Sequence, residues 1–426
     1  MSNPESLWPP VLRGLDPFPL ERFRRACVVA AHPDDETLGV SGLLQRLHAQ
    51  GTEITLVIAT DGEAAFPDAD AAGRRELGKV RRRELHDSLR TQRVADIEPV
   101  WLGLPDSRLA GHAEELTTAL GELTAGADLV LAPWPEDPHP DHQVAGRAAL
   151  AAAPVTAHRW SYPIWLWHWL SPDDPAIQWS RAFAFALSED ERDRKRAGVG
   201  AFTSQLKPGP HGEDPILPPE VLAHFERDTE ILLREPQERS APVSRFAELY
   251  RDNGDPWRVS SSWYERRKRA VTLAALPQQR YSSAVEPACG LGALTRELAP
   301  RCDHLLAFDP VDSAVERTRA AVADLSTVDV HIGALPADLP DGPVDLIVLS
   351  EILYYLSDDD LTATIEQAAL SLRSGGDLVA VHWRQWPPEA PRDGRAAHER
   401  LLAHPELAMI VEHLDEAFVL HVLRRR

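Results

Sequence analysis

Short apolar runs alternate with longer amphipathic stretches along the first half of the chain. The apolar runs lie at 26–31, 53–60 and 127–133 and are rich in valine, isoleucine and leucine. The stretches 37–50 and 73–90 between them mix apolar and polar residues in the manner of helices. This alternation of strand and helix predicts βαβ units, and therefore a parallel sheet covered by helices.

The second half of the chain repeats this alternation. Its apolar runs predict strands at 282–290, 304–310, 328–335, 344–351 and 376–383. Helix-like stretches lie at 294–300, 312–325 and 359–375. The predicted fold class is therefore α/β, with two doubly wound (Rossmann-like) parallel-sheet domains in tandem.

The stretch 233–263 separates the two halves. It contains proline, glycine, serine and charges of both signs without a clear period, which suits a connection. A chain of 426 residues is also too long for one ordinary core. We place the boundary near residue 240, which gives one domain at 1–240 and a second at 241–426.

The charge of the chain narrows the classes of partner. A formal net charge of -21 disfavours a phosphate backbone or an anionic membrane surface, so we expect a small-molecule substrate and no nucleic acid. No apolar run approaches the length of a membrane span, and the opening segment lacks the pattern of a signal peptide. The three cysteines fit a reducing compartment, and we predict a soluble, cytoplasmic protein without membrane insertion. The sequence leaves the oligomeric state open.

Polar loops follow three of the strands predicted in the first half. The first loop is His32-Pro33-Asp34-Asp35-Glu36, the second starts at Thr60 as "TDGE", and the third ends in His139-Pro140-Asp141-His142. Loops at the carboxyl ends of neighbouring parallel strands converge on one crevice. A catalytic zinc site needs three nitrogen or oxygen ligands and one open position, and His32, Asp35 and His142 supply such a set. Two histidines and a carboxylate accept other divalent metals as well.

The ordered motifs "AHPDDE", "TDGE", Arg81-x-x-Glu84, "LGLPD" and "HPDH" resemble the PIG-L (LmbE-like) zinc de-N-acetylases over residues 25 to 235. The resemblance implies zinc ligands at His32, Asp35 and His142. It also implies a general base at Asp34 and positions that hold the sugar at Arg81 and Asp106.

The same resemblance implies that His139 stabilises the oxyanion and that Asp141 tunes it. The chemistry is coherent, because zinc lowers the pKa of water towards about 7 and an imidazolium-type donor at His139 would counter the charge of the tetrahedral intermediate. The base would take a proton from water and return it to the leaving amine.

Simpler structural interpretations exist for several of these residues. Asp34 or Asp35 would be a helix cap that accepts backbone N–H groups of "ETLGV". Arg81 with Glu84 would be an exposed ion pair on a helix, and Asp106 would only shape a turn. The tryptophans of "WSYPIWLWHWL" would fill a core or line a wall.

The second half opens with a glycine loop between a strand and a helix. Gly290 and Gly292 let the backbone approach a ligand, and Asp309 at the end of the next strand can accept both ribose hydroxyls. These features alone would allow NAD, but the third glycine of the dinucleotide fingerprint is missing. The form Glu286-x-x-x-Gly-x-Gly resembles motif one of class I S-adenosylmethionine methyltransferases, although Ala288 replaces a usual glycine.

Three further segments resemble the nodulation-protein-S type of methyltransferase, over about residues 250 to 426. They are "DPWRVSSSWYERRK", "DLIVLSEILYYL" and "GGDLVAVHW". In that type the acceptor is the free amine of a deacetylated glucosamine unit. Ser350 and Glu351 lie at a strand's carboxyl end, where they would face cofactor or acceptor. We expect Ser350 to contact the cofactor and Glu351 to act in catalysis, with His382 as a second candidate helper. The structural alternative for a residue such as Tyr355 is ordinary packing of the strand-to-helix junction.

The fusion of the two halves predicts a sequential enzyme. An amide nitrogen is a poor nucleophile, and deacetylation converts it into an amine that can attack the methyl group of S-adenosylmethionine. We therefore predict zinc-dependent de-N-acetylation of an N-acetylated amino sugar, followed by N-methylation of the exposed amine. Two alternatives stay open: a methyltransferase that acts on an unrelated acceptor, and a second half that binds the cofactor without transfer.

Overall fold

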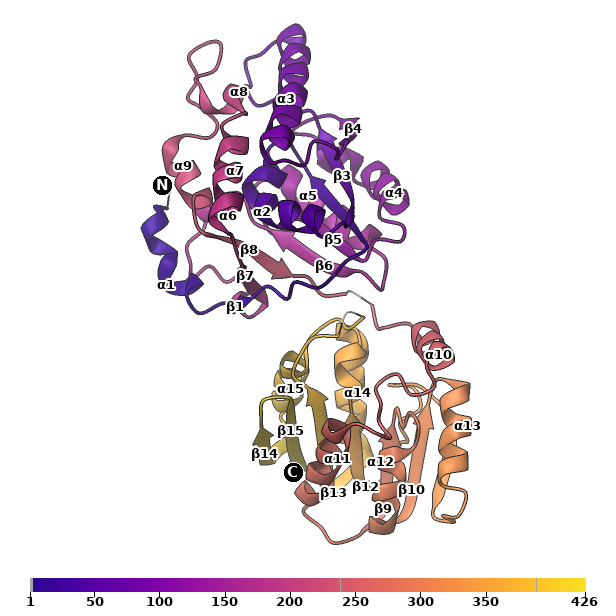
Figure 1. Cartoon of the computed structure of the whole chain (residues 1–426). Helices are drawn as coiled ribbons and strands as arrows, with labels where there is room; N and C mark the ends of the chain where they lie inside the picture. Colours follow the sequence, from indigo (N-terminus) through magenta and orange to yellow (C-terminus); the bar gives the residue numbers. More distant parts are fainter. Residues whose placement is uncertain (1–2, 238, 388) are drawn as a thin grey trace. The chain divides into compact units, whose positions relative to one another are not determined.

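The computed structural model describes residues 3–237, 239–387 and 389–426, and the chain divides into two units, Met1–Glu235 and Pro236–Arg426 (Figure 1). Each unit contains one sheet with helices packed on both faces. The predicted α/β fold class is thereby confirmed. The strands predicted in each half are all present, together with others that the pattern did not indicate.

The sheet of the first unit has eight strands in the order β1-β7-β8-β6-β5-β2-β3-β4. Its central strands are parallel, whereas β8 runs antiparallel to both β6 and β7. β2 therefore lies between β3 and β5, which brings the loops after these three strands to one edge. The strands are β1 (Asp16–Pro17), β2 (Arg25–Ala30), β3 (Glu53–Thr60), β4 (Val100–Leu104), β5 (Leu129–Pro133), β6 (His158–Tyr162), β7 (Ala182–Ala186) and β8 (Thr229–Arg234).

Alternate residues of β2 face opposite sides of this sheet. Val28 packs with α2 and α3 on one side, and Val29 packs with α4 and α5 on the other. Burial on both faces explains why the central strands are apolar throughout. Trp160 and Trp167 are core residues, as expected, whereas Trp169 is exposed. The helices are α1 (Pro9–Leu12), α2 (Asp35–Ala49), α3 (Ala71–Thr91), α4 (Ala113–Leu123), α5 (Pro140–Ala152), α6 (Leu166–Trp169), α7 (Glu189–Val199), α8 (Thr203–Leu206) and α9 (Pro219–Leu222).

The sheet of the second unit has seven strands in the order β11-β10-β9-β12-β13-β15-β14. The first five are parallel, and β15 and β14 extend the sheet as antiparallel strands. The order reverses between β9 and β12, which is where doubly wound sheets form a crevice. The strands are β9 (Tyr281–Pro287), β10 (Cys302–Asp309), β11 (Val328–Ile332), β12 (Val344–Ser350), β13 (Leu372–Trp383), β14 (Leu407–Leu414) and β15 (Phe418–Arg425).

Two clusters of apolar side chains cover the faces of this second sheet. One contains residues of α14 and α15, and the other contains residues of α11 and α12. The helices are α10 (Val243–Asp252), α11 (Trp263–Ala275), α12 (Ala293–Leu298), α13 (Asp312–Ala321), α14 (Asp358–Ser371) and α15 (Gly394–Leu402).

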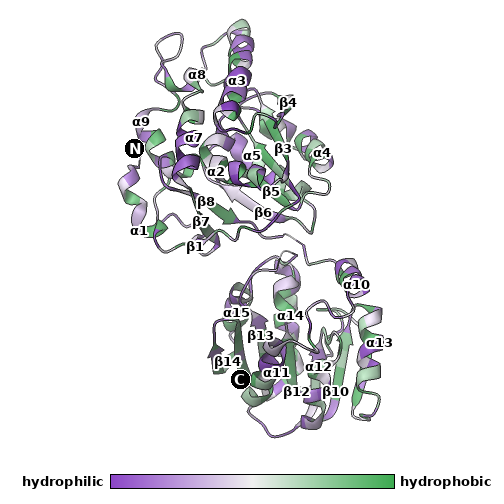
Figure 2. Cartoon of the chain, viewed as in Figure 1, coloured by the Kyte–Doolittle hydropathy of each residue, from purple (hydrophilic) through white to green (hydrophobic). Residues whose placement is uncertain are grey.

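Hydropathy follows the layers of each unit. Figure 2 shows hydrophobic strands such as β3 and β12 inside, and a largely hydrophilic α3. No helix in the described ranges is both long and apolar enough to cross a membrane.

Candidate functional sites

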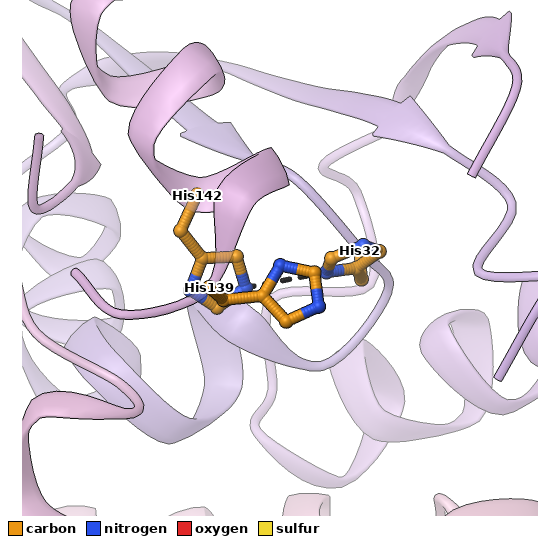
Figure 3. A group of neighbouring side chains, drawn as sticks. All are labelled: His32, His139 and His142. Carbon is orange, nitrogen blue, oxygen red and sulfur yellow. Dashed lines mark hydrogen bonds between the residues drawn. The ribbon is translucent and has the colours of Figure 1, made fainter. Parts of the chain in front are cut away.

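The first candidate site lies at the carboxyl ends of β2 and β5. His32 follows β2, while His139 and His142 lie at the start of α5, directly after the loop that follows β5. Pro140 occupies the first turn of α5, where its fixed φ suits a helix start, and His139 is the N-cap. Figure 3 shows the three imidazole rings gathered together, and each ring offers a nitrogen within 4.8 Å of the others.

The three residues predicted to bind zinc converge. His32 Nδ1 lies 3.2 Å from His142 Nε2, and Asp35 Oδ1 lies 3.2 Å from the same His142 nitrogen. The remaining separation, from His32 Nδ1 to Asp35 Oδ2, is 3.7 Å. Zinc bonds of about 2.0 to 2.1 Å in a tetrahedron place neighbouring ligands about 3.3 Å apart. The separations of His142 Nε2 from His32 Nδ1 and from Asp35 Oδ1 match this value, so the two histidines and the carboxylate suit a zinc ion by residue type and spacing.

The other nitrogen of each ligand histidine contacts a carboxylate. His32 Nε2 lies 3.1 Å from Asp106 Oδ1 and 3.5 Å from Asp141 Oδ2, and His142 Nδ1 lies 3.2 Å from Asp137 Oδ1. Burial opposes protonation of both rings, but these carboxylates together with Asp35 raise the pKa of His32 to about 9 and that of His142 to about 10. Such contacts orient metal-binding imidazoles and make them more basic ligands.

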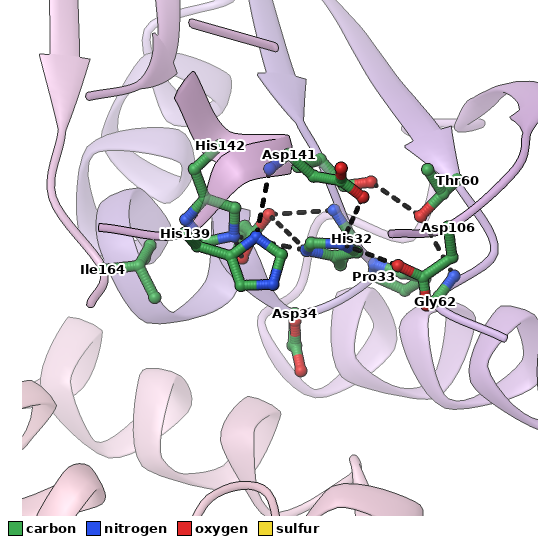
Figure 4. A network of polar contacts seen from close by, with 12 residues as sticks. His32, Pro33, Asp34, Thr60, Gly62, Asp106, His139, Asp141, His142 and Ile164 are labelled. Atoms are coloured by element: carbon green, nitrogen blue, oxygen red, sulfur yellow. Dashed lines mark hydrogen bonds and ion pairs between the residues drawn. The ribbon is translucent and has the colours of Figure 1, made fainter. Parts of the chain in front are cut away.

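Asp137 is a residue of this site that the sequence did not single out. It is fully buried, and its Oδ2 accepts the backbone N–H groups of Ile164 and Trp165 at 3.0 Å and of Leu166 at 3.4 Å. Figure 4 shows Ile164 close to His139 and His142. One carboxylate thus joins His142 to the start of α6. The available signal was its position two residues before His139 in "EDPHPDH".

Asp34 lies beside the ligands in an unusual backbone conformation. Its φ of 137° is strained for a residue with a side chain, and its Oδ2 accepts a hydrogen bond of 2.9 Å from Arg81 Nη2. Burial raises the pKa of Asp34 to about 6, against the opposing effect of Arg81. Within the described part of the chain, its side chain accepts no hydrogen bond from α2, so the interpretation of Asp34 as a helix cap is wrong. Asp35 accepts the N–H of His32 instead.

Arg81 is buried, and it also donates to the carbonyl oxygens of Pro33 at 2.7 Å and Gly62 at 3.1 Å. A Cβ on Gly62 would lie 2.0 Å from Arg81 Nη1, so the close approach requires glycine there. Arg81 does not form an exposed ion pair with Glu84 on the described surface. Glu84 is buried too and accepts hydrogen bonds from Thr203 and Ser204.

The carboxylates of Asp106 and Asp141 accept hydrogen bonds from backbone N–H groups and also contact the ring of His32. Asp106 Oδ2 accepts the N–H of Ala64 at 2.7 Å, and Asp141 accepts the N–H groups of Ser107 at 2.7 Å and Leu109 at 3.2 Å. The sequence placed Asp106 with the sugar and Asp141 with the oxyanion residue. In the structure their carboxylates lie against His32, and contact of Asp106 or Arg81 with a sugar stays a prediction.

His139 has a defined tautomer. Its Nδ1 accepts the backbone N–H of Asp141 at 3.2 Å, so its proton is on Nε2. Burial and the neighbouring His142 and His32 lower the pKa of His139 to about 4. The ring is therefore a neutral donor rather than the imidazolium expected from the sequence.

The second candidate site is a cavity of about 520 Å³ in the second unit. Four of the five predicted cofactor residues line it: Glu286, Gly290, Asp309 and Ser350. Gly292 is not among the described lining residues. It lies at the N-cap of α12 with a φ of 75°, where a Cβ would lie 2.9 Å from Thr318 Cγ2.

The glycine loop keeps its backbone form although Ala288 replaces a glycine. Ala288 has a φ of 54° and Gly290 a φ of 57°, both in the left-handed region. Asp309 accepts the N–H groups of Gly290 at 3.1 Å and Val311 at 2.9 Å, and burial raises its pKa to about 6. Glu286 Oε2 is buried without a hydrogen-bond partner among the described residues, and burial raises the pKa of Glu286 to about 8. An orphaned carboxyl in a cavity fits a cationic ligand group.

Glu351 forms a cluster that the sequence only partly indicated. Its Oε1 accepts a hydrogen bond of 2.5 Å from Lys268 Nζ, and its Oε2 accepts from Tyr354 Oη and from the backbone of Trp383. Lys268 also donates to Glu265 at 2.8 Å. Although burial opposes it, the two carboxylates raise the pKa of Lys268, which therefore stays charged. Lys268 lies within "DPWRVSSSWYERRK", a segment whose sequence alone indicates no role for this lysine.

Comparison with known proteins finds a different family in each half of the chain. Residues 27–153 match the model of the PIG-L family, GlcNAc-PI de-N-acetylase, and residues 243–385 match that of Nodulation protein S (NodS). Nodulation protein S of Sinorhizobium fredii is 37% identical over 157 residues, which are 34% of this chain and 71% of that protein. The chain spans only about half the length of its relatives from Rhizobium tropici (53%) and Bradyrhizobium diazoefficiens (50%).

A deacetylase and a solved methyltransferase resemble the separate halves. The 1D-myo-inositol 2-acetamido-2-deoxy-alpha-D-glucopyranoside deacetylase of Kribbella flavida is 28% identical over 235 residues, which are 46% of this chain and 74% of that protein. The crystal structure of N-methyltransferase NodS from Bradyrhizobium japonicum with S-adenosyl-l-homocysteine has 24% identity and a TM-score of 0.39, covering 43% of this chain and 98% of that chain. The predicted resemblances are confirmed: the chain belongs to the nodulation protein S family through its C-terminal part and carries a PIG-L domain at residues 27–153.

Proposed function

We propose that the chain is a bifunctional enzyme that removes the acetyl group from an N-acetylated amino sugar and then N-methylates the exposed amine. A zinc-dependent de-N-acetylase domain at 1–240 would perform the first reaction, and a methyltransferase domain at 241–426 the second. The observation that carries the proposal is the convergence of His32, Asp35 and His142 in one unit, with a cavity around Glu286 and Asp309 in the other. The relative from Kribbella flavida, which is named as a deacetylase of an acetamido sugar, supports the choice of substrate.

In the first reaction, His32, Asp35 and His142 would hold zinc. When bound, zinc supplies Lewis acidity that activates water and polarises the amide carbonyl. Asp34 is the base: it takes a proton from the attacking water and later gives it to the leaving amine. A base works best with a pKa near the working pH, and burial has raised that of Asp34 to about 6.

Other residues of the first unit position these groups. Arg81 holds the Asp34 carboxylate at 2.9 Å. His139 offers its Nε2–H to the oxyanion of the tetrahedral intermediate, a contribution on the order of 3 kcal/mol for donors of this kind. Asp106 and Asp141 hold the ring of His32, and Asp137 that of His142. We retain contact with the sugar as a proposed second role of Arg81 and Asp106.

In the second reaction, the cavity would hold S-adenosylmethionine, which supplies an activated methyl group. Asp309 accepts the ribose hydroxyls, and the orphaned Glu286 carboxyl takes the α-amino group. Gly290 allows close approach of the backbone, and Ser350 lines the same cavity. Glu351 holds the acceptor amine and takes its proton after transfer, while Lys268 and Tyr354 keep the carboxylate in place.

Mass spectrometry tests both reactions on the same sample. N-acetylglucosaminides are incubated with zinc-loaded protein, with and without S-adenosylmethionine, using the wild type and the variants Asp34→Asn and Asp309→Ala. We expect loss of an acetyl group that requires Asp34, then gain of a methyl group that requires the cofactor and Asp309. Asp87→Asn and Asp324→Ala are matched controls, because both carboxylates are exposed and pair with the arginines Arg90 and Arg296.

The pattern of failure separates the alternatives. Deacetylation without methyl gain would mean that the second unit uses an unrelated acceptor or binds the cofactor without transfer, and titration with S-adenosylhomocysteine distinguishes these two. Absence of both changes would overturn the assignment of substrate class.

A further inference from the structure

Three buried histidines form a row of hydrogen bonds in the second unit, and the row begins at the turn that contains Glu351. His382 lies at the end of β13, His398 lies in α15 and His421 lies in β15. Figure 1 labels these three elements in the second unit. His382 Nδ1 is 2.8 Å from His398 Nε2, and His398 Nδ1 is 2.6 Å from His421 Nδ1. This row of histidines ends at the surface, where His421 Nε2 lies 3.4 Å from Glu412 Oε1.

The contacts at the two ends determine the tautomer of every ring. At the inner end, His382 Nε2 accepts the backbone N–H groups of Ile352 at 3.3 Å and Leu353 at 3.0 Å. A nitrogen that accepts cannot carry the proton, so His382 is protonated at Nδ1 and donates to His398. By the same reasoning His398 donates from Nδ1, and His421 donates from Nε2 to Glu412.

Burial keeps the inner rings neutral. It lowers the pKa of His382 to about 3, with a further contribution from Lys268, and it holds the pKa of His398 well below its usual range. A neutral imidazole has one donor and one acceptor nitrogen, which is the set that each position in the chain requires.

The turn that His382 holds is the one that presents Glu351. Glu351 has a φ of 54°, in the left-handed region that a residue with a side chain adopts only when its surroundings enforce it. The end of β13 supplies that enforcement. Glu351 N–H donates to Val381 O at 2.9 Å, the next two N–H groups donate to His382, and Trp383 N–H donates to the Glu351 carboxylate at 3.0 Å.

The hydrogen bonds of His382 distinguish two roles for the three histidines, a path for protons and a support for the Glu351 turn. A row of histidines could pass protons, but His382 Nε2 is occupied by two backbone N–H groups that do not exchange protons in catalysis. His382 is also not among the described residues that line the cavity. The geometry favours a supporting role over a proton path.

We propose that His382, His398 and His421 are positioning residues that hold the Glu351 turn in the conformation needed for methyl transfer. Glu412 accepts from the outermost histidine, His421, and so determines in which direction the three histidines donate their hydrogen bonds. The structural part of this inference stands by itself, whereas its effect on catalysis rests on the proposed methyl transfer.

The tautomers are tested first, since they require no substrate. Long-range ¹H–¹⁵N correlation spectra of the full chain, labelled at histidine nitrogens, report which ring nitrogen carries the proton. We expect protonation at Nδ1 in His382 and His398 and at Nε2 in His421. A proton on Nε2 of His382 would overturn the proposal, because that nitrogen would then repel the N–H groups of the turn.

The hold on the turn is tested with variants of His398. Phe at this position fills similar space but can neither accept nor donate, whereas Gln can do both. Leu401→Ala is the matched control, because Leu401 is buried in the same helix and belongs to the apolar core. In His398→Phe we expect amide hydrogen exchange at Ile352 and Leu353 to accelerate at least about tenfold relative to the other amides of the sheet, with partial recovery in His398→Gln.

Kinetics then separate positioning from loss of stability. With a free-amine glucosamine oligosaccharide as acceptor, His398→Phe should lower kcat about 10- to 100-fold and leave the KM for S-adenosylmethionine within about twofold. Leu401→Ala should destabilise the fold but keep kcat. Equal kcat in His398→Phe and the wild type, or equal loss in Leu401→Ala, would refute the catalytic part. Absence of transfer by the wild type would instead refute the proposed function, and the exchange and tautomer results would still decide the inference.

Discussion

Asp137 offers a sharp test of the first site, because five N–H groups converge on its two oxygens. His142 Nδ1 lies 3.2 Å from Oδ1, which also accepts the backbone N–H of His139 at 3.1 Å, and the backbone N–H groups of Ile164, Trp165 and Leu166 point at Oδ2. For His142 to bind metal through Nε2, its Nδ1 must carry a proton and donate. Asparagine keeps the shape of the side chain but has only one oxygen. In Asp137→Asn, the NH₂ group of the amide must therefore face N–H donors in either orientation of the side chain.

The expected magnitude follows from what is lost. A buried donor without an acceptor costs about 1 to 3 kcal/mol, so the free energy of unfolding should fall by that amount. Loss of a carboxylate behind a metal-binding histidine typically weakens metal binding about 10- to 100-fold. This factor corresponds to about 1.4 to 2.7 kcal/mol. Denaturant unfolding measures the first quantity, and competition for zinc with a fluorescent chelator measures the second.

Glu136→Gln is the control for Asp137→Asn. Glu136 is the adjacent acid, but its side chain is 55% exposed and pairs with Arg147. We expect its variant to match the wild type in both measurements. If Asp137→Asn bound zinc as tightly as the control, the reasoning that Asp137 orients His142 would be refuted. A loss of stability without loss of zinc affinity would restrict its role to holding the start of α6.

Three further predictions concern the cofactor and the order of reaction. Burial raises the pKa of Asp309 to about 6, so below that pH the carboxylate is protonated and loses its capacity to accept both ribose hydroxyls. The affinity for S-adenosylhomocysteine should therefore fall about tenfold per pH unit below about 6 and stay level above about 7. Calorimetry on Asp309→Asn should show no such dependence on pH. Ala288→Gly should change that affinity less than about threefold, since the backbone already has the left-handed conformation; a tenfold gain would show that the Cβ obstructs the cofactor. Excess unlabelled free amine, added with a labelled N-acetylated substrate, should dilute the label in the methylated product; undiluted label would show that the intermediate does not equilibrate with solution.

The position of the first site was predictable because it depends on strand ends. The apolar run of β2 stops at His32, and the run of β5 stops shortly before His139. Parallel strands bring such ends to one edge whatever the details of packing. The observed order β5-β2-β3 then places His32 between the other two loops. For the same reason Glu286, Asp309 and Ser350 share one cavity in the second unit.

The supporting groups were not predictable, because they depend on contacts between distant segments. Arg81 lies on α3 and its spacing from Glu84 suggests an exposed pair, but tertiary packing buries it against Asp34. Lys268 precedes the first strand of its unit and meets Glu351 across 83 residues. The antiparallel strand β8 was missed as well, since its short run "TEILLR" carries no mark of direction.

The order of the two proposed reactions follows from the chemistry of the proposed substrate. An acetamide nitrogen has a delocalised lone pair and does not attack a sulfonium methyl group, so the second site cannot act before the first. The freed amine should titrate near the α-amino reference of about 8, which leaves about a tenth of it neutral at pH 7. Glu351, which Lys268 holds in place, can therefore hold the amine and accept its proton, because the second site needs proximity more than strong basicity. Every residue assigned to the first reaction comes from Met1–Glu235 and every residue assigned to the second from Pro236–Arg426, so sequential action requires only that the amine reach the second cavity.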